Sequence, residues 1–225
     1  MTYEYFSRNG QLLPASQAVV PLDDIAYAYG FGVYETVRVS GGIVYFAQQH
    51  AARLLASARE IGLEHGFSAS DTEQAIQELV RKNQAEACNV KILLVGGPTA
   101  ESATLYMQCL NPLFPDRKLY KEGATLITER YQREYPHAKT LNMLPSYLAY
   151  RRALAAGAYD ALLVDDEGNI TEGTRTNFFG MQGRTLISPP EAGILLGVMR
   201  TVVLKVAADN GFRSSWAMKA KCSLT

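Results

Sequence analysis

The first half of the chain shows two hydrophobic spacings, one typical of helices and one typical of strands. A stripe of leucine, alanine and isoleucine side chains on one face predicts a helix over residues 47–61, preceded by a short strand at 43–46. A second amphipathic helix is predicted to start at Ser70, because Ser70-Asp-Thr-Glu73 has the composition of a capping box. Residues 90–95 and 103–109 are short apolar runs and predict two strands.

Residues 111–123 interrupt these patterns with two prolines, a glycine and several charges, which predicts a linker between domains. We therefore expect an N-terminal α/β domain over residues 1–115 and a C-terminal domain over residues 116–225. In the second half, a helix is predicted over 145–156, ended by Gly157, and a last helix over 198–210. Short apolar runs predict further strands at 161–164, 176–181 and 185–187. Strands and helices intermingled in this way indicate a mixed α/β (α+β) fold of two lobes.

Composition and charge limit the classes of function that this protein can be expected to have. The 225 residues carry 22 basic and 22 acidic side chains, so no net charge favours nucleic acid or an anionic membrane as a partner. The cysteines Cys88, Cys109 and Cys222 are scattered, which matches neither a disulfide framework nor a zinc site, and no other metal is expected. The N-terminus lacks a signal pattern, and no run of about 18 apolar residues predicts a membrane span, so we expect a cytoplasmic protein.

One lysine and one carboxylate suggest the chemistry. Lys139 lies upstream of the segment Asn169-Ile-Thr-Glu-Gly-Thr-Arg-Thr-Asn-Phe-Phe179, which contains Glu172. A lysine amine can condense with an aldehyde, and a carboxylate can keep a pyridine nitrogen protonated, which are two tasks that pyridoxal 5'-phosphate (PLP) requires of a protein. Each residue taken singly is more often an exposed charge, so the hypothesis depends on their order and context.

Five motifs in series resemble one known family. Tyr29-Gly-Phe-Gly-Val-Tyr-Glu-Thr-Val-Arg38 and His50-Ala-Ala-Arg-Leu-Leu-Ala-Ser57 are followed by the Lys139, Glu172 and Gly197 segments. In this order they resemble the fold-type IV (class IV) PLP-dependent aminotransferases, which include branched-chain and D-amino-acid aminotransferases and aminodeoxychorismate lyase. The resemblance covers nearly the whole chain. It implies a two-lobed fold with a small N-terminal α/β domain, and a homodimer in which each site takes residues from the neighbouring subunit.

The resemblance also implies roles for individual residues. Lys139 would be the Schiff-base lysine and proton shuttle, and Glu172 would pair with the pyridine nitrogen. The phosphate would be held by Arg53 and by the backbone N–H groups of Val198 and Met199 at a helix start, with Asn177 bracing the site. A guanidinium and a helix N-terminus suit a dianionic phosphate.

The resemblance implies an enzyme that moves an amino group between an amino acid, branched-chain or similar, and a 2-oxo acid. Tyr34, Arg38 and Arg175 are candidates for binding the substrate carboxylate. A β-eliminating lyase like aminodeoxychorismate lyase shares the same cofactor groups and stays open as an alternative. So does a PLP-binding protein with little activity.

The sequence departs from the family pattern at three places. Met199 replaces a threonine common in the phosphate-binding motif, which removes a hydroxyl but keeps the N–H. Asn142-Met143 is closer to the D-amino-acid group than to the branched-chain enzymes, yet Gly97-Pro-Thr-Ala-Glu-Ser102 lacks the arginine and histidine of the well-known D-specific enzymes. The tail from Arg213 to Thr225 does not match the family, so we expect a C-terminal domain without its usual last strands.

Overall fold

The computed structural model describes residues 3–21 and 23–216, which form two compact units. Unit 1 comprises Met1–Phe114 and Ala138–Asn142, and unit 2 comprises Pro115–His137 and Met143–Thr225. The short segment that carries Lys139 therefore belongs to unit 1, although its neighbours in sequence belong to unit 2. The domain boundary at residues 115–116 stays a prediction.

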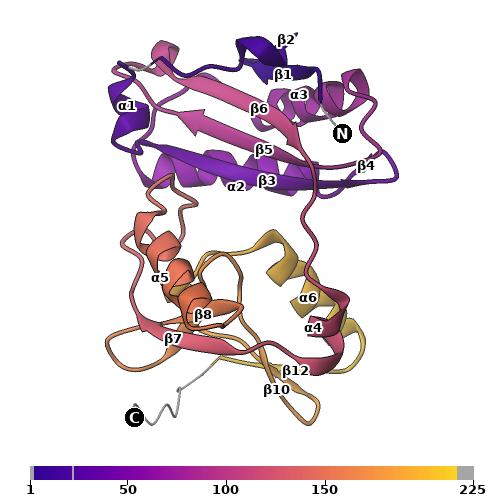
Figure 1. The fold of residues 1–225 in the computed structure, drawn as a ribbon, viewed down its shortest axis with the longest axis vertical. Helices are drawn as coiled ribbons and strands as arrows, with labels where there is room; N and C mark the ends of the chain where they lie inside the picture. The colour runs from indigo at the N-terminus through magenta and orange to yellow at the C-terminus, as the bar shows by residue number, and fades with distance from the viewer. Residues whose placement is uncertain (1–2, 22, 217–225) are drawn as a thin grey trace. The chain divides into compact units, whose positions relative to one another are not determined.

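Unit 1 is built on a six-stranded antiparallel sheet with the order β2-β1-β6-β5-β3-β4 (Figure 1). The strand β5 shows why these residues form a sheet, since every second residue from Cys88 to Leu94 is buried and the residues between them are less so. The strands predicted at 90–95 and 103–109 are confirmed, and the one at 43–46 is shorter than predicted. The strands are β1 (Tyr5–Arg8), β2 (Gln11–Pro14), β3 (Gly32–Ser40), β4 (Ile43–Val44), β5 (Ala87–Val95) and β6 (Thr104–Leu110).

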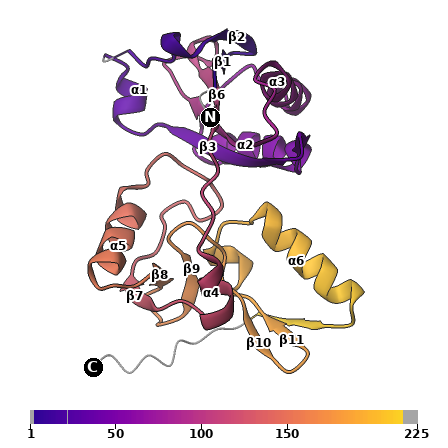
Figure 2. The same ribbon diagram turned by 45° about the vertical axis from the view of Figure 1, so that its right-hand side comes forward.

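Two helices, α2 (Ala47–Glu60) and α3 (Ala69–Lys82), pack against each other and against one face of this sheet (Figure 2). Leu54 on α2, together with Ile76 and Leu79 on α3, is fully buried in the core that they enclose. Both helices were predicted, but the cap of α3 was placed wrongly at Ser70. The N-cap is Ser68, whose extended backbone lets its hydroxyl accept a hydrogen bond from the Asp71 N–H at 3.1 Å.

Short helical segments connect the strands, and one of them corrects the predicted linker. They are η1 (Ala15–Gln17), α1 (Ile25–Ala28), η2 (Ala100–Ser102) and α4 (Arg117–Glu122). The helix α4 lies within residues 111–123, where only irregular chain was expected. Asp116 caps it by accepting a hydrogen bond from the Lys118 N–H at 2.9 Å.

Unit 2 contains a first sheet, in which β7 (Leu126–Arg130) is parallel to β8 (Asp160–Val164), and β8 is antiparallel to β9 (Ile170–Gly173). The helix α5 (Leu144–Ala155) buries Ala149 and Ala153 against Ala161 and Leu163 of β8. Small alanine side chains allow this close approach of helix and sheet. The predicted helix at 145–156 and strand at 161–164 are confirmed, and β7 and β9 were not predicted.

A second sheet of unit 2 has the order β10-β11-β12, with β10 (Gly180–Gln182), β11 (Thr185–Ile187) and β12 (Arg213–Ser215). The segment η3 (Glu191–Gly193) and the helix α6 (Val198–Asp209) complete the unit. The strand predicted at 176–181 is wrong for 176–179, because that segment is a bend in which Asn177 makes an isolated bridge to Glu172.

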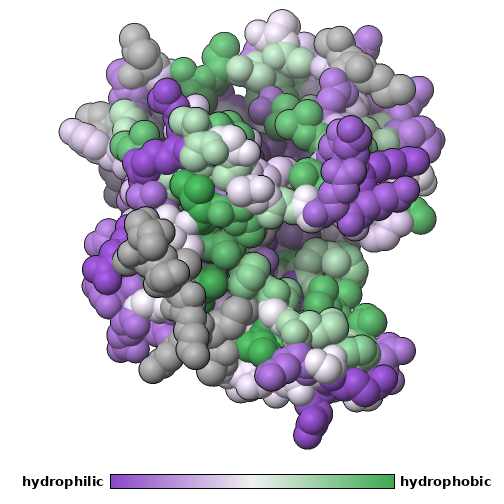
Figure 3. Space-filling view, turned by 60° about the horizontal axis from the view of Figure 1, so that its bottom comes forward, coloured by the Kyte–Doolittle hydropathy of each residue, from purple (hydrophilic) through white to green (hydrophobic). Residues whose placement is uncertain are grey.

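The surface carries exposed hydrophobic side chains among polar ones, as one face of the molecule shows (Figure 3). On α6, Met199, Val203 and Val206 are exposed. Among the residues described, no helix combines the length and the apolar character needed to cross a bilayer. Cys222 and most of the unusual tail, residues 217–225, lie outside the described part of the chain. The mixed α/β fold class is confirmed.

Candidate active site

Lys139 is held in unit 1 by backbone hydrogen bonds on both sides of its peptide unit. Its carbonyl accepts a hydrogen bond from the Tyr34 N–H at 2.8 Å, and its own N–H donates to the Ser57 hydroxyl at 3.1 Å. The Leu141 N–H donates to the Gly32 carbonyl at 2.9 Å, so the segment runs along β3. These hydrogen bonds hold the Lys139 backbone in place beside β3.

The Tyr34 ring is in contact with two amines. The Nζ atoms of Lys139 and Lys91 are each 4.4 Å from the centre of this ring, within the range of a cation–π interaction. Burial lowers the pKa of the Lys91 amine, and the neighbouring charge of Lys139 lowers it further. Lys91 was not among the predicted site residues, although a lysine inside the apolar run of β5 is a signal that could have indicated it.

Arg53 lies on the inner side of α2 and pairs with a carboxylate that sequence analysis missed. Its Nε donates to Glu35 Oε1 at 2.6 Å and its Nη2 to Glu35 Oε2 at 2.8 Å, while His50 Nδ1 lies 2.8 Å from Oε2. Glu35 is fully buried in β3. Burial alone raises the pKa of this carboxyl, but the hydrogen bonds and charges of His50 and Arg53 outweigh it and hold the pKa below its ordinary value.

Glu172 is the buried carboxylate of unit 2. It lies on β9, 5% exposed, and its Oε1 accepts a hydrogen bond from Arg133 Nη1 at 3.1 Å. Arg133 also donates to the carbonyls of Tyr135 and Pro136. The guanidinium thus places a positive charge beside a carboxyl group that could bind a protonated ring nitrogen. Arg133 was not among the predicted site residues, because the stretch around it shows no periodicity.

Asn177 and Glu172 together fix the turn that leads into α6. The Asn177 amide donates to the Leu195 carbonyl at 2.8 Å, and the Leu195 N–H donates to Glu172 Oε2 at 3.3 Å. A Cβ atom added to Gly197 would collide with the Asn177 side-chain oxygen, so this position requires glycine. Gly197 is the N-cap of α6 and has no side chain to occupy the first N–H groups, which can therefore bind an anion.

The two phosphate-binding positions predicted on α6 differ in exposure. Val198 is buried and Met199 is exposed, and both lie in the first turn of the helix. Their backbone N–H groups belong to the set that has no partner within a helix. A phosphate contact through the backbone, as predicted, is therefore compatible with either side chain.

Each of the two predicted substrate arginines stacks on an aromatic ring. Arg38, four residues along β3 from Tyr34, has its guanidinium 4.4 Å from the centre of the Phe114 ring. Arg175 is exposed and stacks on Tyr150 at 4.1 Å. Their assignment to a substrate carboxylate stays a prediction.

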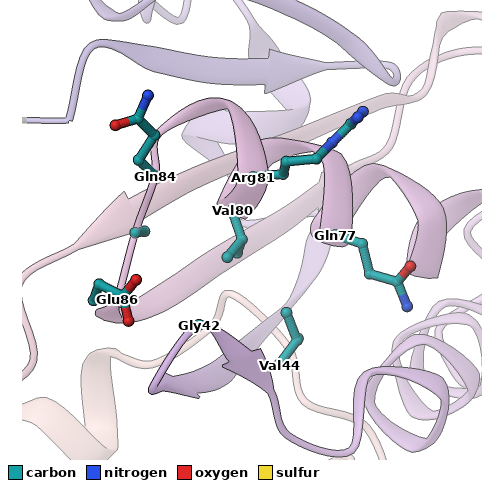
Figure 4. Close-up of a pocket in the computed structure, with 8 residues that line it drawn as sticks. Gly42, Val44, Gln77, Val80, Arg81, Gln84 and Glu86 are labelled. Carbon is teal, nitrogen blue, oxygen red and sulfur yellow. The ribbon is translucent and has the colours of Figure 1, made fainter.

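A separate open pocket of unit 1 contains none of the predicted site residues (Figure 4). It lies beside the end of α3, has a volume of about 440 Å³ and receives the side chains of Val44 and Val80. It is lined by Gly42, Val44, Gln77, Val80, Arg81, Gln84, Ala85 and Glu86. In the described part of the chain, no group of three or more histidine, cysteine or acidic residues is arranged to hold a metal ion.

The sequence matches one family model and is similar to known enzymes. A family model described as amino-transferase class IV matches residues 32–217. The D-alanine aminotransferase of Bacillus licheniformis is 32% identical over 212 residues, which cover 90% of this chain and 75% of that protein.

Two solved structures of branched-chain aminotransferases are similar in fold to this chain. That of Escherichia coli has a TM-score of 0.91 at 22% identity, and the match covers 99% of this chain and 80% of that one. The enzyme from T.th., complexed with N-(5'-phosphopyridoxyl)-L-glutamate, has a TM-score of 0.87 at 26% identity, with 98% and 78% covered. The first of these shows the fold alone.

Proposed function

The chain belongs to the class IV aminotransferase family, and from this premise we propose that it moves an amino group between an amino acid, branched-chain or similar, and a 2-oxo acid, with PLP as its cofactor. The observation that carries the proposal is the family match over residues 32–217, a range that contains both Lys139 and Glu172. The T.th. relative, whose complex contains a phosphopyridoxyl derivative of glutamate, supports the cofactor and the type of substrate.

The residues of this chain fit three of the polar groups of PLP. The aldehyde requires an amine, which Lys139 supplies, and the ring nitrogen requires a carboxylate, which Glu172 supplies beside Arg133. The phosphate requires N–H donors, which Arg53 and the start of α6 supply. Gly197 supports this fit, because the backbone there is left uncovered by any Cβ.

When bound, PLP supplies an electron sink that stabilises negative charge at the substrate Cα. The protein has to hold the ring and to move a proton at that carbon. We assign the proton transfer to the Lys139 amine, because its backbone is fixed at both N–H and carbonyl and an amine can accept and donate a proton. Glu172 keeps the ring nitrogen protonated, and its own geometry is held by Arg133 and by the Leu195 N–H.

The substrate carboxylate is assigned to Tyr34, Arg38 or Arg175, as the sequence suggested. Tyr34 is supported most directly, because the Lys139 amine lies over its ring. Lys91 extends this set, since its amine lies over the same ring. It also lines a cavity of about 90 Å³ with the side chains of Leu93 and Tyr106. An amine at an otherwise largely apolar cavity suits a substrate with a second carboxylate, such as glutamate or its 2-oxo acid.

The experiment that tests the activity is an absorbance spectrum of the protein loaded with PLP. We expect a band near the visible edge that an amino acid bleaches and a 2-oxo acid restores, because a transaminase completes both halves of the reaction. A band that no amino acid in a broad panel bleaches would contradict the proposed activity. Pyruvate released from a β-substituted substrate without transamination would indicate the lyase instead.

The role of Lys91 has its own test. Lys91→Met should raise the KM for 2-oxoglutarate about tenfold or more, since a charge-assisted hydrogen bond is worth about 1.5–3 kcal/mol, and should leave the KM for a monocarboxylic 2-oxo acid unchanged. Lys91→Arg, which keeps the charge, is the matched control. Equal changes for both acids would contradict a contact with the second carboxylate.

A further inference from the structure

Glu35 is a fully buried carboxylate that binds two basic side chains of one helix. His50 and Arg53 are three residues apart on α2, so they lie on the same face and reach the same carboxylate on β3. Three contacts of 2.6–2.8 Å join them to its two oxygens. This group lies one helical turn before Ser57, whose hydroxyl holds the Lys139 backbone.

A buried ion at this place is costly, which suggests a geometric purpose. Withdrawing a carboxylate from water is offset here by its hydrogen bonds, yet an apolar residue of similar volume often stabilises a core equally well. The other buried side chains of β3, such as Val33 and Val37, are apolar. A structural role alone therefore does not require a charge at position 35.

The geometry of the contact specifies which part of Arg53 is used. A guanidinium is a rigid planar fork with five N–H groups, and Glu35 accepts hydrogen bonds from Nε and Nη2, which form one edge of this fork. Two contacts to one edge fix both the position and the plane of the fork. The end of the fork, formed by Nη1 and the second N–H of Nη2, points away from Glu35.

We propose that Glu35 is a positioning residue for phosphate binding, which fixes the Arg53 guanidinium so that the end of its fork meets the cofactor phosphate, while His50 holds the carboxylate in place. The inference rests on the proposed function, because it takes Arg53 as a phosphate ligand. Glu35 would thus support phosphate binding through Arg53, without contacting the phosphate itself.

Glu35 could either offset charge or position Arg53, and these two roles predict opposite changes in phosphate binding when its charge is removed. Removing a negative charge next to the phosphate site favours anion binding by Coulomb's law, so a carboxylate that only offsets charge predicts tighter binding in Glu35→Gln. A carboxylate that positions Arg53 predicts weaker binding, because the long arginine side chain is then free to adopt other rotamers. The sign of the change therefore distinguishes the two roles.

The experiment compares PLP with pyridoxal, which lacks the phosphate. Protein freed of cofactor by dialysis is titrated with each compound, and the ratio of the pyridoxal dissociation constant to the PLP dissociation constant measures the phosphate contribution. We expect Arg53→Ala to lower this ratio on the order of ten- to hundredfold and Glu35→Gln to lower it by about tenfold. The double variant should lose no more than Arg53→Ala alone, because both act through one contact.

Controls separate positioning from general damage. Asp160→Asn removes a different buried carboxylate, one that accepts a hydrogen bond from Thr174, and should leave the ratio unchanged. Glu35→Asp keeps the charge but withdraws it by one methylene, so it should lower the ratio. If Glu35→Gln does not fold, Glu35→Asp tests the proposal in its place. A lowered stability by itself weakens PLP and pyridoxal equally and does not move the ratio.

The outcomes are distinguishable. A ratio that both Glu35 variants leave unchanged or increase, with Arg53→Ala lowering it, would overturn the positioning role and leave the proposed function intact. An unchanged ratio in Arg53→Ala would overturn the phosphate role of Arg53 and the inference with it. Wild-type protein that binds no PLP would overturn the proposed function itself.

Discussion

At the scale of residues, the two buried carboxylates differ in what they hold. Glu35 joins β3 to α2 through His50 and Arg53, whereas Glu172 accepts hydrogen bonds from Arg133 and from the backbone N–H of Leu195. The sequence suggested Arg53 and Glu172 but not their partners. Partners come from segments distant in sequence, and a single sequence carries no signal of such a pairing.

Gly197 is closely packed, so the effect of adding a methyl group there can be predicted. Gly197→Ala should weaken PLP binding by about tenfold or more, because the added methyl displaces Asn177, and overpacking typically costs about 1–3 kcal/mol. The matched control is Gly193→Ala, four residues earlier, where an added Cβ would meet the Thr171 side chain at an ordinary contact distance of 4.0 Å. The PLP dissociation constants and thermal midpoints of both variants check this. Equal behaviour of the two would show that Asn177 yields without consequence.

At the scale of elements, regular periodicity decided what could be predicted. The helices α2, α3, α5 and α6 each have a clear hydrophobic stripe or a glycine stop, and the sequence located all four. The strand β3 was missed because Glu35 interrupts the series of buried apolar residues Val33, Val37 and Val39, and its pairing with α2 is a tertiary effect. The strand β9 was missed because its four residues follow directly on turn-forming ones.

The contact between β3 and α2 predicts a pH dependence of stability. Folding lowers the pKa of Glu35, so its contribution to the free energy of unfolding is complete above the unfolded pKa, near 4.3, and is lost as the pH falls through the lower folded pKa. Glu35→Gln should be less stable by about 3–5 kcal/mol at neutral pH, because two basic groups lose their partner. Its stability should also fall less steeply with acid.

Urea denaturation from pH 7 into the acid range measures both effects. Glu129→Gln is a suitable control, since Glu129 forms an ion pair with Arg152 that is more exposed to water. Parallel stability curves for the wild type and Glu35→Gln would contradict the assignment of an ionised Glu35.

At the scale of the whole molecule, the family identity came from the order of the motifs rather than from any one of them. The sequence could not show that Lys139 lies along β3 and is held by Ser57, because these contacts join distant parts of the chain. Nor could it reveal Lys91 beside Lys139. Fold class follows from patterns within elements, whereas the details of a site follow from packing between them.

We predict that the molecule is a homodimer, as closed two-fold assemblies are the commonest oligomers and the family resemblance implies one. Sedimentation velocity at micromolar concentration, with PLP bound, should give a species of twice the mass of the 225-residue chain. A single monomeric species under these conditions would count against the prediction.

The central claim is that Lys139 is the lysine that carries the cofactor, and reduction with borohydride tests it most directly. Protein incubated with PLP, reduced and digested should show the pyridoxyl group on the peptide containing Lys139 by mass spectrometry, and Lys139→Ala should abolish it. Lys91 is the sharpest internal control, because its amine lies at the same distance, 4.4 Å, from the Tyr34 ring. A stoichiometric adduct on Lys91 or any other lysine, persisting in Lys139→Ala, would contradict the account.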